Sequence, residues 1–246
     1  MREAKLTDWE AGDDLPALIF NSTVNETSER FLFANYQVGP LSEELRKQQA
    51  RRVFHEEFPK NDIRVATAVR MSAAFPYVSP VAKAVDEHGQ TIDKKDYHLA
   101  DGGYYDNYGV ASALDFVADG VAPGSKDRIL LVLIEAGPEN AFKDTTRGDK
   151  GWGFQAIAPP YGLLRLWQIV ARARNAADLD WAKRYASGMT FVRFVYRDET
   201  ESPTSWSLHP DQKASIAKQF KTEKGNVDAL AMLRNWMHDG TVSSPR

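Results

Sequence analysis

The chain has 246 residues, of which 43% are hydrophobic and 26% charged, a composition that suits a soluble α/β protein with a sizeable core. Its formal net charge of −3 provides no basic footprint, so we expect no nucleic-acid partner. The absence of cysteine excludes disulfides, thiolate metal sites and cysteine nucleophiles.

The start of the chain and its apolar runs predict neither secretion nor a membrane span. Residues Met1 to Lys5 are charged and no apolar stretch follows them, so they do not form a signal peptide. The longest aliphatic run, Ile129 to Ile134, is too short to cross a bilayer. We therefore expect a cytoplasmic or membrane-peripheral protein.

The first third of the chain predicts a pair of strands followed by helical segments. Apolar runs at Pro16–Asn21 and Arg30–Tyr36 flank a polar stretch, which predicts strand, loop and strand. Residues 41–58 are charged and helix-prone. Ile63–Phe75 has small and apolar residues at helical spacing, and Pro76 ends that pattern.

The middle of the chain predicts two strands around one helix. Tyr97–Ala100 is a short strand that runs into Asp101, and Val110–Val121 is a helix. Arg128–Glu135 is an apolar run without alternation, which predicts an interior strand covered on both faces. We expect its apolar part, Ile129–Ile134, to be central in the sheet and to have Tyr97–Ala100 as its neighbour.

The last third predicts a long helix, a strand and two closing helices. The ranges are Pro159–Ala186, Met189–Tyr196, Pro210–Phe220 and Val227–Met237. This order of elements is typical of a layered α/β domain. No internal repeat or linker interrupts the sequence, so we expect a single domain over residues 1–246.

The segment most informative about chemistry is Asp101-Gly102-Gly103, where a predicted strand ends shortly before a helix. Ligands of open α/β sheets gather at the carboxyl ends of strands, and glycines let the backbone approach another segment closely. An aspartate held there can accept a proton from a nucleophile within hydrogen-bond reach. Taken alone, the same residues also suit an ordinary turn.

Two further segments carry a resemblance to a known family. Pro16–Thr27 contains Asn-x-Thr, and Arg64–Pro80 contains Ser-Ala-Ala-Phe-Pro; both precede Asp-Gly-Gly in that order. With Ser205-Trp-Ser-Leu208 before a late helix, residues 15–240 resemble the bacterial form of the patatin-like phospholipase family. The most specific part of this resemblance covers residues 64–110.

The resemblance implies a fold, a reaction and a set of site residues. The fold is a patatin-like three-layer α/β/α sheet, and the reaction is hydrolysis of phospholipid or acylglycerol esters by a Ser–Asp dyad, without cofactor or metal. Asp101 corresponds to the general base, Gly102 and Gly103 form its loop, and Asn107 helps to hold that loop. The lipid ester substrate allows peripheral membrane contact.

The family's nucleophile and oxyanion loop have no counterpart in this sequence. The nucleophile lies in G-x-S-x-G on a strand-to-helix elbow, whereas no serine here has glycines two residues before and after it, Ser187-Gly188 being the nearest case. We therefore expect a sheet that is incomplete on its N-terminal side, with the missing half encoded upstream. A degenerate relative and a separate chain that supplies the front half are the alternatives. The rival function is a non-catalytic lipid-binding or interaction module that kept the fold and lost the nucleophile.

Other side chains could carry chemistry but have simpler explanations. Ser72 could replace the nucleophile, although a small residue at a helix end is typical of close packing. Asp106 and Asp101 could form a carboxylate pair for glycoside hydrolysis, although Asp106 and Asn107 suit the cap of the helix that begins near Gly109.

The histidines and aromatic residues predict no separate site. The five histidines lack metal-binding spacing. His98 lies three residues before Asp101 in a predicted strand, so the two side chains point to opposite faces and a triad is not expected. Aromatic residues around the loops could line an acyl groove or a membrane-facing rim, although core packing is their more common role. These residues are Tyr104, Tyr105, Tyr108, Trp152, Phe154, Tyr161 and Trp167.

Overall fold

The computed structural model has a mixed α/β fold, which confirms the α/β class expected from the sequence. The patatin-like three-layer arrangement stays a prediction. It describes residues 4–9, 15–36, 44, 50–74, 82–83, 97–121, 127–136, 169–171, 173–184, 188–196 and 208–242. The chain divides into two compact units, residues 1–125 with 164–178 and residues 126–163 with 179–246. Asp101 belongs to the first unit. The single domain expected over residues 1–246 stays a prediction.

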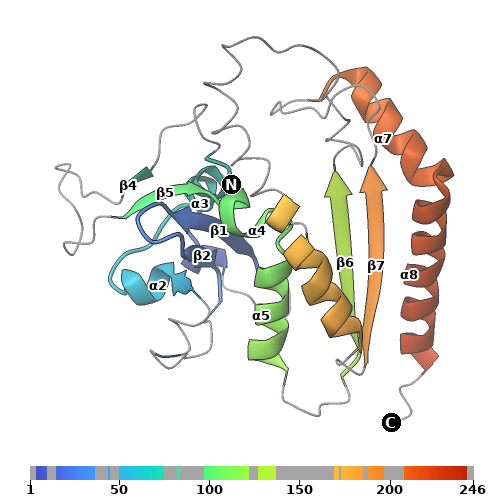
Figure 1. The fold of residues 1–246 in the computed structure, drawn as a ribbon, viewed down its shortest axis with the longest axis horizontal. Helices are drawn as coiled ribbons and strands as arrows, with labels where there is room; N and C mark the ends of the chain where they lie inside the picture. The colour runs from blue at the N-terminus through green and yellow to red at the C-terminus, as the bar shows by residue number, and fades with distance from the viewer. Residues whose placement is uncertain are drawn as a thin grey trace. The chain divides into compact units, whose positions relative to one another are not determined.

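The first unit contains a five-stranded sheet in the order β3-β2-β1-β5-β4. Figure 1 labels four of these strands, β1, β2, β4 and β5. The strands are β1 Ile19–Val24, β2 Arg30–Ala34, β3 Arg51–Val53, β4 Ala82–Lys83 and β5 His98–Asp101. β1 runs antiparallel to both β2 and β5, β4 runs antiparallel to β5, and β3 runs parallel to β2. The strand, loop and strand expected near the start of the chain are confirmed as the β1–β2 hairpin.

One face of this sheet carries the apolar core of the first unit. Side chains alternate along a strand, so Phe31, Phe33 and Leu99 share a face and pack with Phe54 and Phe58. The helices α2 Phe54–Glu57 and α3 Val65–Ser72 contact the sheet here. The helix expected from Ile63 to Phe75 is therefore confirmed within the described residues.

The helix expected over residues 41–58 is wrong for residues 51–53, which form β3. β3 pairs in parallel with β2 and buries Arg51 and Val53. The charged composition of this stretch favours helix locally, but pairing and burial outweigh intrinsic propensity. Within the described part of this stretch, only Glu44 and the short α2 are helical.

The opposite face of the sheet holds buried arginines that bind helix α5, Val110–Gly120, which confirms the helix expected there. The Arg30 guanidinium donates to the Asp115 carboxylate, and Arg51 Nη1 donates to Asp119 Oδ2 at 3.0 Å. Both arginine side chains are almost fully buried. Because losing one partner of a buried ion pair is costly, these contacts fix α5 on the sheet.

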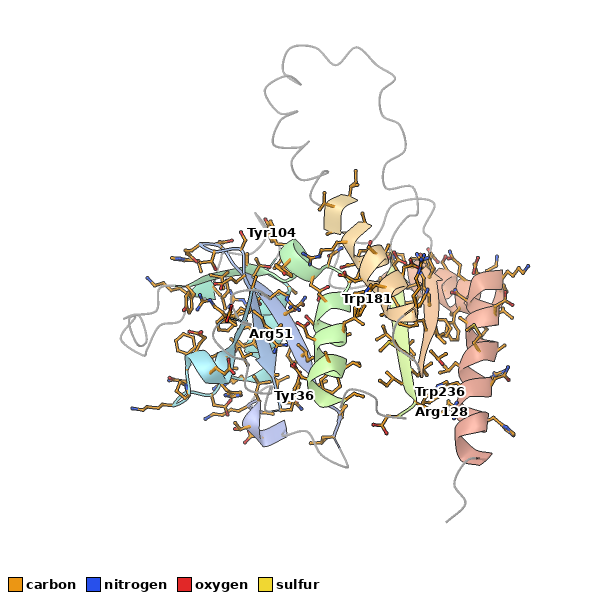
Figure 2. The ribbon with its side chains drawn as sticks, turned by 60° about the horizontal axis from the view of Figure 1, so that its bottom comes forward. Tyr36, Arg51, Tyr104, Arg128, Trp181 and Trp236 are labelled. Carbon is orange, nitrogen blue, oxygen red and sulfur yellow. The ribbon has the colours of Figure 1, made fainter. Side chains whose placement is uncertain are left out.

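The charges of these ion pairs act on the phenol of Tyr36. Figure 2 labels Tyr36 and Arg51. Its ring packs edge-on against Phe116, with 5.2 Å between ring centroids. Burial raises the pKa of Tyr36 to about 12, the negative charges of Asp119 and Asp115 add to this effect, and Arg51 opposes it. The folded state therefore favours the neutral phenol.

We expect an absorbance titration to show one tyrosine with a pKa near 12 that disappears in Tyr36→Phe. The folded pKa exceeds the ordinary value of 10.0, so Tyr36 contributes stability below pH 10.0 that is lost as the pH rises toward 12. Urea unfolding between these pH values should show a steeper loss of stability in the wild type than in Tyr36→Phe. Equal pH dependence in both proteins would contradict this assignment.

The second unit consists of a strand pair and two helices. β6 Ile129–Ala136 and β7 Met189–Tyr196 run parallel. The helices α7 Pro210–Thr222 and α8 Lys224–Val242 pack on β7 (Figure 1). Val192 and Phe194 of β7 meet Ala229 of α8. All four elements confirm the expected types and positions.

Two expectations about β6 are wrong within the part of the chain that the structure describes. Its neighbour is β7, whereas β5 pairs with β1 and β4. β6 is also not covered on both faces, because Ile134 is 78% exposed and Val132 is 39% exposed. An apolar run reveals a strand, but it does not specify the pairing partner or the covered face.

The long helix expected over Pro159–Ala186 is present at residues 169–171 and 173–184, and its first part lies outside the described residues. Among the residues that the structure describes, no helix combines the length and apolar character that a membrane crossing requires.

Candidate active site

Asp101 is the last residue of β5 and therefore lies at the carboxyl end of its strand, as the sequence predicts. Gly102 follows, and the short helix α4 Gly103–Asp106 begins directly after it. Asp101 Oδ1 accepts the Gly103 N–H at 2.6 Å. Burial raises the pKa of the half-buried Asp101 carboxyl, and the Gly103 N–H opposes that rise. A carboxylate with a raised pKa is a stronger base than an exposed one.

Strand β1 holds the Asp101 loop from one side. Thr23 Oγ1 donates to the carbonyl oxygen of Asp101 at 3.0 Å, and Asn21 Nδ2 donates to the carbonyl oxygen of Asp106 at 2.9 Å. Gly102 lies directly against Asn21, because a Cβ atom on Gly102 would be 2.1 Å from the Asn21 carbonyl oxygen. The Asn-x-Thr segment therefore fixes both ends of the loop.

The C-terminal end of α3 holds the loop through the backbone. The Asp101 N–H donates to the Ala74 carbonyl and the Gly102 N–H donates to the Ser72 carbonyl, both at 3.1 Å. Carbonyl groups at a helix end lack partners within the helix, and the loop supplies them. Ser72 thus contributes a backbone carbonyl here, and the packing role expected for its side chain stays a prediction.

Asp106 caps helix α5, which confirms the capping explanation for it. Its carboxylate is 2% exposed and accepts the N–H groups of Ser112 at 2.8 Å and Ala111 at 3.3 Å. Asn107 is exposed and borders the loop, since a Cβ atom on Gly103 would be 2.7 Å from Asn107 Oδ1. Both carboxylate oxygens of Asp106 therefore accept N–H groups of helix α5.

His98 contacts Glu26 rather than the Asp101 loop. Its Nδ1 atom lies 2.6 Å from Glu26 Oε1, and its backbone N–H donates to Glu26 Oε2 at 3.1 Å. This agrees with the expectation, from strand alternation, that His98 and Asp101 point to opposite faces.

Ser22 lies at this site although its sequence context does not indicate it. The strand register places Ser22 opposite Asp101 on β5 and opposite Phe31 on β2. Residues paired across strands share a face of the sheet. The Ser22 side chain is fully buried, and its hydroxyl has no hydrogen-bond partner among the described residues. The only sequence signal was its place inside Asn-Ser-Thr, which does not reveal the strand that faces it.

Three of the seven aromatic residues expected around the loops are described. Tyr104 and Tyr105 lie on α4, where Figure 2 labels Tyr104, and Tyr108 follows that helix. The Tyr105 ring packs against the guanidinium groups of Arg30 and Arg174, at 5.1 and 4.6 Å from the ring centroid. Tyr105 therefore has a structural role. The other four, Trp152, Phe154, Tyr161 and Trp167, lie outside the described residues.

Within the described ranges, no group of three or more histidines and carboxylates stands where it could hold a metal ion. Comparison with known protein families, characterised proteins and solved structures finds no match to this chain.

Proposed function

We propose that this chain carries the general-base half of a Ser–Asp lipid acyl hydrolase, with Asp101 as the base. The observation that supports this most is the meeting of three distant segments at Asp101: residues 21–23, 72–74 and 101–103. They belong to the motifs on which the resemblance to patatin-like phospholipases rests. A turn that only reversed the chain would need no such contacts with two other elements.

The proposed reaction uses the carboxylate of Asp101 as a proton acceptor. Asp101 takes the proton of a serine hydroxyl as its oxygen attacks the ester carbonyl carbon, and it returns the proton to the leaving alcohol. In the second step, a water molecule attacks the carbonyl carbon of the acyl-serine while Asp101 takes a proton from this water. Asp101 then returns the proton to the serine oxygen, and the free acid is released. The Thr23 hydroxyl donates to the Asp101 carbonyl, and the Asp101 N–H donates to the Ala74 carbonyl. These hydrogen bonds would hold Asp101 in place for both steps.

The fold of the first unit supports the finer assignment. Helices α2 and α3 contact one face of its sheet, and α5 is bound to the other face through Arg30 and Arg51. A patatin-like three-layer α/β/α sheet requires this arrangement. The serine and the oxyanion N–H groups must come from another segment, because this sequence contains no G-x-S-x-G. We assign them to a front half encoded upstream.

We expect this chain alone to hydrolyse p-nitrophenyl esters no faster than a buffer control, since it lacks the elbow serine. Co-expression with the polypeptide encoded directly upstream should produce hydrolysis and a serine that reacts with a fluorophosphonate. Turnover by the chain alone that survives removal of contaminating esterases would contradict the proposal. Ser72→Ala and Ser22→Ala would then show which serine is responsible.

A further inference from the structure

A cavity of about 230 Å³ lies in the first unit between helices α2 and α3 and the sheet face that carries Leu99. Its wall is mainly aromatic and aliphatic. Six residues make up most of this apolar wall: Phe31, Phe33, Phe54, Phe58, Met71 and Leu99. Empty apolar cavities of about 150 Å³ are known to bind a molecule as large as benzene, so this cavity is large enough for a ligand.

The polar lining residues lie nearer the surface than the apolar ones. Asn61, Thr67 and Lys83 are half-buried, whereas Phe31 and Phe33 are 1% exposed. The cavity thus has an apolar interior and a partly polar margin. Sites for small ligands commonly have this distribution.

Two residues that line the cavity lie close to the Asp101 loop along the chain. Leu99 lines it, and Asp101 lies two residues further along β5 on the same face, with Cα atoms about 7 Å apart. Met71 also lines it, and the next residue, Ser72, accepts the Gly102 N–H. The wall of the cavity formed by Leu99 and Met71 is therefore near the loop that carries the proposed base.

We propose that this cavity binds the acyl chain of the substrate while the ester group lies at Asp101, an inference that rests on the proposed function. A methylene group is about as large as a water molecule, which occupies about 30 Å³. The volume of 230 Å³ therefore holds roughly eight methylene groups. The substrates are therefore esters of medium-chain acids, with about eight carbons in the acyl group.

Titration of the full chain with neutral methyl esters of C4, C6, C8 and C12 acids tests this inference by calorimetry. Each buried methylene should increase the affinity about fourfold. The affinity should rise up to about C8 and then level off, because the cavity is full. No measurable binding of methyl octanoate, or an affinity independent of chain length, would overturn the inference.

Two matched variants on α3 locate the binding. Thr67→Phe fills the cavity and should weaken methyl octanoate binding roughly tenfold or more. Val69→Phe adds a phenyl group on the same helix at a position 41% exposed, and it should leave the affinity within about twofold. If Thr67→Phe melts early, Thr67→Leu takes its place. Unchanged affinity in a folded Thr67 variant would overturn the inference.

Asp101→Asn separates this inference from the proposed function, because Asp101 does not line the cavity. Chain-length-dependent binding without Asp101-dependent hydrolysis in the completed protein would overturn the proposed function alone. Asp101-dependent hydrolysis without chain-length-dependent binding would overturn this inference alone.

Discussion

Gly102→Ala should destabilise the first unit by about 3 kcal/mol, the upper end of the usual cost of overpacking. The added Cβ atom would lie 2.1 Å from the Asn21 carbonyl oxygen and 2.7 Å from its carbonyl carbon. Both atoms belong to the backbone of β1, so relief requires the loop to separate from the strand. Gly102 has φ −62° and ψ −25°, which alanine adopts freely, so the effect is purely steric.

Two other glycines provide controls for this measurement. Gly109 has φ +68° and open space around its Cα, so Gly109→Ala should cost about 1 kcal/mol through backbone conformation alone. Gly120 ends α5 with open space and no positive φ, so Gly120→Ala should gain up to about 1 kcal/mol. Urea unfolding compares the three variants. Equal stability of Gly102→Ala and Gly120→Ala would contradict the packing of the loop on β1.

Elements with strong local patterns could be predicted from the sequence. The strand expected at Met189–Tyr196 has the same bounds in the structure, and the helix expected at Val110–Val121 differs by one residue. The pairing of β6 with β7 was missed, because an apolar run contains no information about its neighbour. Residues 51–53 were also missed, since a strand of three residues is specified by pairing with β2 rather than by local propensity.

The candidate site was predictable in its centre but not in its surroundings. Asp101 could be placed at a strand end because the strand pattern stops at a pair of glycines. The contacts of Gly102 with Asn21 and Ser72 depend on how β1, β5 and α3 meet, which no local pattern encodes. Ser22 could not be predicted for the same reason, since only the strand register shows that it pairs with Asp101 across β1 and β5.

Asp101→Asn should lower ester hydrolysis by about 10²–10⁴-fold in the protein completed with the proposed serine segment, because it removes the proposed proton acceptor. Asparagine keeps the Oδ1 atom that accepts the Gly103 N–H, and the bonds from Thr23 and to Ala74 involve only backbone atoms of residue 101. The loop should therefore keep its shape.

Asp101→Asn should lose activity without losing stability. Burial raises the folded pKa of Asp101, so the stability associated with this carboxyl is fully present below its ordinary value of 3.8 and is lost as the pH rises through the folded pKa. Asparagine carries no charge and avoids this loss. At neutral pH the variant should be at least as stable as the wild type.

Asp106→Asn is the matched control, since it makes the same chemical change five residues away. Asparagine retains one of the two oxygens that accept the N–H groups of Ala111 and Ser112, so stability should fall by about 1 kcal/mol. Ester hydrolysis per folded molecule should stay within a few-fold of the wild type, because Asp106 caps α5 and takes no proton.

The most direct test is the hydrolysis of p-nitrophenyl octanoate per folded molecule by the completed protein, measured for the wild type, Asp101→Asn and Asp106→Asn beside urea unfolding of each. If Asp101 is the base, Asp101→Asn should lose hydrolysis and keep its stability. Asp106→Asn should keep its hydrolysis. Full hydrolysis by Asp101→Asn together with its loss in Asp106→Asn would contradict the assignment of Asp101 as the base.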